Sequence, residues 1–353
     1  MLIEFIAFFL GLSLLLYFLF AGADFGAGIL ESFAGSRRKK DQQELITHAM
    51  GPVWEANHVW LILAVVILMN GFPKAFSQIS ISFHIPLTIM LLGIVMRGCA
   101  FTFRHYDAVH DQSQTYYSFI FRFSSILTPI VLGMIAGASI LGKVLDFRPD
   151  LSFYDIYLSS WLNLFCLSVG LFVCVLFSFL AAVYLIGETE DDELREIFVT
   201  RAKVANCIAV VTGLIVFLTA QIEGLPLLAN FLKVKGSFFC MAGATFILYP
   251  LWKSLIARKV FSSRILAAAQ VSLILVGWFW MQFPVLISKK HSAGLDSLTI
   301  YNTAASNSTL LYLGYALVGG MLVVLPALVY LLIVFKIGEP TSDQEDSAKA
   351  NSK

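Results

Sequence analysis

The chain has 353 residues, of which 58% are hydrophobic and only 13% are charged. A soluble protein of this length carries about 25% charged residues, so the composition excludes a water-soluble globular fold and indicates a polytopic membrane protein. The formal net charge of +1 does not favour a nucleic-acid partner. The five cysteines lie in or beside apolar runs without CxxC or Cys/His spacing. We therefore interpret them as buried apolar residues and predict no metal site.

Apolar runs long enough to cross a bilayer, about 20 residues each, divide the chain into nine predicted helices. The predicted spans are 3–30, 54–72, 79–103, 116–142, 157–186, 203–231, 237–257, 264–287 and 308–336. Short connections between them predict antiparallel neighbours. We expect an all-α polytopic membrane protein with about nine transmembrane helices. The helical domain covers 1–338, and the polar tail 339–353 is predicted to be a disordered cytoplasmic segment.

Most of the 24 Lys and Arg residues, including the basic run 37–40, fall on one side of this topology. Because the basic side of a membrane protein faces the cytoplasm, we expect the N-terminus outside and the C-terminus inside. The segment 187–200, GETEDDELREIFVT, is expected to begin a cytoplasmic amphipathic helix. The first apolar run lacks a basic n-region and is too long for a signal peptide, so no cleavable signal is expected.

Several polar groups are predicted at one depth, near the cytoplasmic side. Asp24 lies in the first span within GADFGAG (22–28), where small residues permit close helix approach or an irregular turn. Glu55 and His58 lie three residues apart, on one face of the second span, and Arg97 closes the third. An ionisable residue inside a membrane is a functional hypothesis by default. We therefore predict a proton-accepting relay that opens to the cytoplasm.

Structural roles compete with this interpretation. Asp24 pairs with Arg97 in one alternative, and Glu55 complements the helix dipole in another. His58 favours a hydrogen-bonded structural role over haem or metal ligation. Trp54 also suits an aromatic belt at the membrane interface. Since only two of the six histidines lie within spans, any haem chemistry is expected mainly on a partner chain.

A different class of protein, a secondary transporter, would use Asp24, Glu55 and Arg97 as an ion or substrate site. Two features oppose it: the acids lie near one membrane face rather than at the midplane, and the sequence shows no pair of broken helices.

The sequence resembles subunit II of the cytochrome bd-type quinol oxidases. The resemblance rests on the segment 51–61, GPVWEANHVWL, on the glycine-rich 22–28, on Arg97-Gly98 and on the run 298–305, LTIYNTAA. It implies a complex in the bacterial inner membrane that oxidises quinol and reduces dioxygen to water. In that family, subunit I holds the haems b and haem d. Subunit II contains two four-helix bundles plus one peripheral helix, contacts lipid and braces subunit I.

The resemblance also implies roles for single residues. Glu55 matches an acid in the family's proton path from the cytoplasm, Asp24 matches the first-helix acid, and Trp54 matches a tryptophan beside a structural quinone. Two positions depart from some relatives: Ala21 and Thr102 stand where those relatives have acids. Thr102 can pass a proton through a hydroxyl-water chain but cannot store one. A purely structural scaffold remains the alternative, and a small single-helix subunit is left open.

Overall fold

The computed structural model describes residues 1–35, 38–50, 54–106, 113–144, 152–289 and 296–337. For residues 54–56, 105, 106, 113, 329 and 331–337 it describes the backbone alone.

Long helices dominate the described part of the chain and confirm an all-α polytopic membrane protein. Eight of them are long and apolar enough to cross a membrane by themselves. They are α1 (Leu2–Ser32), α5 (His84–Tyr106), α6 (Ser113–Leu141), α8 (Leu164–Leu185), α9 (Asp192–Ile222), α11 (Lys235–Ile256), α12 (Val260–Gln282) and α13 (Asn307–Ile337). The count rises to nine if the bent pair of α3 (Trp54–Gly71) and α4 (Pro73–Ser82) is one span.

Short elements lie at the two ends of these helices. One end carries α2 (Lys39–Met50) and is called the α2 end. The other carries α7 (Phe153–Tyr157), α10 (Leu227–Lys233) and the antiparallel pair β1 (Val285–Ile287) and β2 (Leu298–Thr299), and is called the hairpin end.

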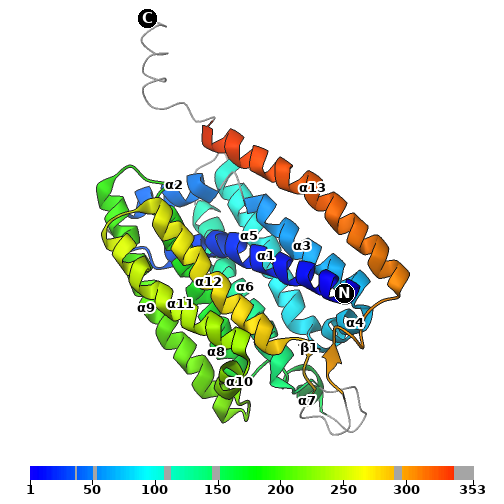
Figure 1. Ribbon diagram of the computed structural model, residues 1–353. Coiled ribbons are helices and arrows are strands. Elements are labelled where there is room, and N and C mark those ends of the chain that lie inside the picture. Colours follow the sequence, from blue (N-terminus) through cyan, green and yellow to red (C-terminus); the bar gives the residue numbers. More distant parts are fainter. Residues whose placement is uncertain (36–37, 51–53, 107–112, 145–151, 290–295, 338–353) are drawn as a thin grey trace, which may run out of the picture.

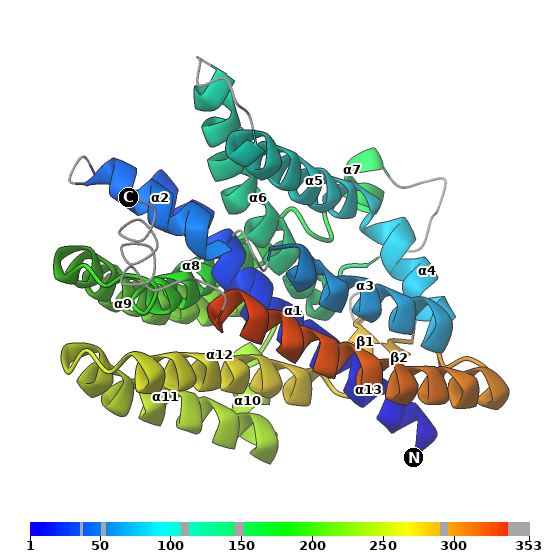
Figure 2. The same ribbon diagram turned by 90° about the horizontal axis from the view of Figure 1, so that it is seen from above.

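The helix α1 lies in the middle of the molecule, between two groups of helices (Figures 1 and 2). It packs against α3 and α6 on one side and against α8 and α12 on the other. The first group continues from α6 to α5, and the second contains α8, α9, α11 and α12. The last helix, α13, packs against α1 and α3 at the edge. With α1 counted in the first group, this is the arrangement of two four-helix bundles and one peripheral helix that the family resemblance implies.

Glycines in α1 explain how its neighbours come so close. A Cβ on Gly26 would lie 1.9 Å from the backbone oxygen of Phe177 in α8, and one on Gly28 would lie 2.2 Å from Ser125 Oγ in α6. The helix is continuous through 22–28, so the glycines serve close approach rather than an irregular turn. Asp24 therefore lies where α6 and α8 approach α1 closely.

The chain bends sharply after the second predicted span, 54–72, which α3 matches. The pair of α3 and α4 is bent by 117°. Pro73 stands at the first position of α4, where its missing N–H is tolerated and its fixed φ favours a helix start. The bend lies at the hairpin end, away from Asp24. The third span was predicted too long, because α4 occupies its first residues and α5 begins only at His84.

Other predicted boundaries differ from the structure, and the sixth span ends at Ile222 rather than at 231. The acidic segment 187–200 does not form a separate helix. Its residues from Asp192 on are continuous with the span α9, which starts there because the Asp191 side chain accepts hydrogen bonds from the backbone N–H groups of Glu193 and Leu194. The fifth span begins at Leu164 because Asn163 caps it. The eighth ends at Gln282, since Pro284 has no N–H for a continuing helix.

We expect Gly26→Ala to reduce the yield of folded protein severely. Its methyl group would overlap a backbone atom of α8, and overpacking of this kind costs about 1–3 kcal/mol or more. The yield is measured as the monodisperse peak of detergent-extracted protein in gel filtration. Gly319→Ala is the matched control, since no described atom lies within 4 Å of the added methyl. Equal yields of the two variants would contradict the close approach of α1 and α8.

Candidate functional site

Asp24 of α1 and Arg97 of α5 form an ion pair enclosed by protein. Arg97 Nη1 donates to Asp24 Oδ2 and Nη2 to Oδ1, both at 2.7 Å. Nη2 also donates to the Asp24 backbone oxygen at 2.9 Å, and Nε donates to Ser125 Oγ at 3.1 Å. Asp24 is 0% exposed and Arg97 1%. Two parallel charge-assisted hydrogen bonds of this kind fix the geometry of the partners.

Aromatic rings complete the surroundings of the guanidinium. The Arg97 carbon Cζ lies 4.8 Å from the ring centroid of Phe25 and 4.9 Å from that of Phe121. The electron-rich ring faces attract the cation in a low-dielectric site. Arg97 is thus held by hydrogen bonds in its plane and by rings on its faces.

A second ion pair repeats the first at the α2 end, and the sequence analysis missed it. Arg104 Nη1 donates to both carboxylate oxygens of Glu31 at 2.9 Å. Glu31 and Arg104 each lie seven residues beyond the members of the first pair, which is about 10.5 Å along each helix. The ring of Phe121 also contacts Arg104, at 4.6 Å. The equal spacing of two acids in α1 and two arginines in α5 was the available signal.

The second pair also contacts α2. Gln43 Nε2 donates to Glu31 Oε1 at 3.1 Å, and Arg104 Nη2 donates to Thr47 Oγ1 at 2.9 Å. The helices α1, α2 and α5 therefore meet at Glu31, whose side chain is fully buried.

His58 of α3 lies near the first pair. Its ring centroid is 6.2 Å from that of Phe25, which covers Arg97, and 6.3 Å from that of Tyr17. His58 Nδ1 and the Tyr17 hydroxyl are both buried, and neither has a hydrogen-bond partner within the described residues. The structure thus brings His58 to the site predicted for it.

The remaining predicted site residues are Glu55, Trp54 and Thr102. Glu55 and Trp54 lie in the first turn of α3, but their side chains fall outside the described part of the chain. Thr102 is partly buried in α5. It lies five residues from Arg97, about 140° around the helix, so it does not share the face that meets Asp24.

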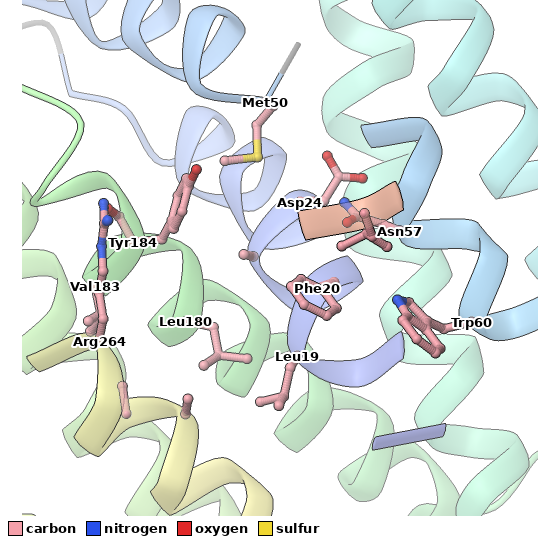
Figure 3. A pocket seen from close by; sticks show the side chains of 14 residues that line it. Leu19, Phe20, Asp24, Met50, Asn57, Trp60, Leu180, Val183, Tyr184 and Arg264 are labelled. Atoms are coloured by element: carbon pink, nitrogen blue, oxygen red, sulfur yellow. The ribbon is translucent and has the colours of Figure 1, made fainter. Parts of the chain in front are cut away.

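A cavity of about 330 Å³ lies beside Asp24, between α1, α3, α8, α12 and α13. Figure 3 shows Met50 at its α2 end, Arg264 on one side and Trp60 and Asn57 on the other. The remaining lining is mostly aliphatic. A cavity of this size and apolar character suits a ligand with a long hydrocarbon part.

Arg264, which lines this cavity, already forms an ion pair with Glu188. Its Nη2 donates to the Tyr184 backbone oxygen at 2.6 Å and to Glu188 Oε1 at 2.7 Å. Among the described residues, no group of three or more His, Cys, Asp or Glu side chains is placed to hold a metal ion.

Comparison with known proteins gives partial matches to two curated relatives. The cytochrome bd ubiquinol oxidase subunit 2 of Bacillus subtilis is 28% identical over 160 residues, which are 45% of this chain and 46% of that protein. The cytochrome bd-I ubiquinol oxidase subunit 2 of Escherichia coli K12 is 24% identical over 121 residues, 34% of this chain and 31% of that protein. The aligned stretches thus span less than half the length of these relatives.

The fold and the family match over nearly the whole chain. The structure of a bd oxidase from Geobacillus thermodenitrificans superposes with a TM-score of 0.75, over 96% of this chain and 99% of that chain, at 19% identity. At this identity the match shows the fold. The family model of cytochrome bd terminal oxidase subunit II matches residues 2–335. Since this match covers almost the entire sequence, the chain belongs to the cytochrome bd terminal oxidase subunit II family.

Proposed function

We propose that this chain is the second subunit of a membrane quinol:oxygen oxidoreductase in an aerobic respiratory chain. It binds a haem-bearing subunit I and supports reduction of dioxygen to water, without being catalytic alone. The family match over residues 2–335 carries this proposal. The membrane-spanning helices that enclose two ion pairs support it.

The haems b and haem d belong, in this proposal, to subunit I. A haem held by two histidines needs a pair of imidazoles that face each other. In the described part of the chain, His58 faces Phe25 and Tyr17. His84 begins α5 and is exposed, with Nδ1 at 2.9 Å from the Ile81 backbone oxygen. His58 and His84 therefore do not form such a pair.

We propose that the α2 end faces the cytoplasm of a bacterial-type inner membrane, so the N-terminus lies outside. Arginines and lysines at this end support the orientation through the positive-inside rule. They include Arg38, Lys39, Lys40, Arg104, Arg122, Arg201, Arg258 and Arg264.

We propose different roles for the two acids in a proton path from this side. Asp24 is held by two Arg97 nitrogens, which favours a structural role for its carboxylate. Glu55 lies one turn from His58 on the same face of α3, so we assign proton exchange to Glu55. Thr102 is the weakest member, since it lies on another face of α5.

Asp24 and Arg97 already satisfy each other, which argues against a transporter that binds its substrate there. A purely structural scaffold stays the main competing proposal, and the Glu55 variants below separate the two.

The cavity beside Asp24 supports a second assignment, a structural quinone whose tail lies along its aliphatic wall. The amide of Asn57 and the indole of Trp60 border it and offer hydrogen bonds and a flat contact for a quinone ring. Trp54 joins this site by family resemblance.

We expect Glu55→Gln to lower oxygen consumption per haem by about a hundredfold, the lower range for a lost general acid or base. The substitution keeps the side-chain shape but removes the titrating group. Haem content is expected to stay normal, and Glu55→Asp should retain part of the rate. Full turnover in Glu55→Gln would favour the scaffold, and loss of the haems would indicate a role in assembly.

We expect Asp24→Asn to lower the amount of assembled complex rather than its turnover per haem. The change leaves Arg97 buried without a counter-charge, which costs about 3–5 kcal/mol. The double variant Asp24→Asn/Arg97→Gln, which removes both charges, should recover part of the yield. A normal yield with a collapsed rate would instead make Asp24 a member of the proton path.

We expect Ala268→Phe to fill the cavity and to lower the quinone extracted per haem from the purified complex. Ala268 lines the cavity, whereas its neighbour Ala269 lies about 100° around α12. Ala269→Phe is therefore the matched control for added bulk. The same quinone content in both variants would place the quinone elsewhere in the complex.

A further inference from the structure

The helix α2 lies with one face buried against the membrane helices. Its buried residues are Gln42, Ile46, Ala49 and Met50, at the i, i+4, i+7, i+8 spacing of a single helix face. Lys40 and Glu44, on the opposite face, are exposed. The buried face packs against α1 and α8. The helix therefore covers the α2 end of the bundle.

Polar contacts anchor both ends of α2. At its start, Arg38 donates to Asp41 at 2.6 Å and also pairs with Asp191, the N-cap residue of α9. The hydrogen bond from Arg38 holds the pKa of the Asp191 carboxyl below its usual value. Further along, Gln43 and Thr47 contact the pair of Glu31 and Arg104.

Of these two sets of contacts, those at Glu31 and Arg104 involve the more deeply buried charges. The side chain of Glu31 is 0% exposed and that of Arg104 is 10% exposed. A buried pair is stable only when its remaining hydrogen-bonding groups are also satisfied. Gln43 and Thr47 form hydrogen bonds with the pair, so α2 has one favourable position against it.

The end of α2 closes the cavity beside Asp24. Met50, its last residue, is 1% exposed and lines that cavity (Figure 3). Only residues 51–53 separate Met50 from the first turn of α3. A chain of this length spans at most about 14 Å. The position of α2 therefore determines where Met50 borders the cavity, and it restricts where α3 can begin.

We infer that Glu31 and Arg104 are positioning residues that hold α2 as a cap over the Asp24 cavity. By fixing α2, they keep Met50 between the cavity and the cytoplasmic water and hold the first turn of α3, which carries Glu55, in place. This inference rests on the proposed orientation and on the proposed proton role of Glu55.

The test loosens α2 without breaking either ion pair. In the assembled complex, Gln43→Leu and Thr47→Val together remove the two hydrogen bonds between α2 and the Glu31–Arg104 pair. We expect amide hydrogen exchange of residues 39–50 to become about tenfold faster or more, as for the loss of a hydrogen bond worth about 1.4 kcal/mol. We also expect turnover per haem to fall several-fold at unchanged haem content, because small displacements of a reacting group slow proton transfer.

Glu44→Gln is the matched control, since it changes the exposed face of the same helix and should alter neither readout. Faster exchange with unchanged turnover would overturn the positioning role and leave α2 as a cover only. Unchanged exchange would show that these contacts do not anchor α2, and would also overturn the inference. Failure of the proton role is distinguishable, because it appears as normal turnover in Glu55→Gln whatever α2 does.

Discussion

Burial of the Asp24–Arg97 pair is the constraint on which the arrangement of helices depends. Neither charge is tolerated alone inside the bundle, because an isolated buried ion costs several kcal/mol. Arg97 must therefore reach Asp24 from α5, Ser125 must approach from α6, and rings of α1 and α6 must cover the guanidinium. One ion pair thus fixes the mutual positions of three helices.

Close packing makes this pair possible. The glycines that flank Asp24 allow α8 and α6 to approach α1 to distances that any side chain would block. Such contact excludes water, and electrostatic attraction is stronger where water is excluded. The glycines and the acid are therefore linked, because burial of the acid needs close packing and close packing needs the glycines. This explains why they stand together in the segment 22–28.

The sequence was sufficient for the fold class, the family and most of the spans, because apolar length alone identifies membrane helices. It did not reveal the sharp bend at Pro73 or the strands at Val285 and Leu298, since these depend on local backbone geometry at the ends of the apolar runs and between them. At the site, Asp24, Arg97 and His58 were recognised, but Glu31 was not. An acid near a membrane face is usually predicted to be exposed, and only the packing of α2 shows that Glu31 is buried.

The two ion pairs also bear on the proton exchange proposed for Glu55. The Asp24 carboxylate accepts two hydrogen bonds from Arg97, and the Glu31 carboxylate accepts two from Arg104. Charge-assisted pairs of this kind hold their side chains in one arrangement. Glu31 also accepts a hydrogen bond from Gln43 of α2, and only residues 51–53 separate α2 from the first turn of α3. The proton exchange proposed for Glu55 would therefore take place on a helix that is joined through α2 to a rigid frame of two ion pairs.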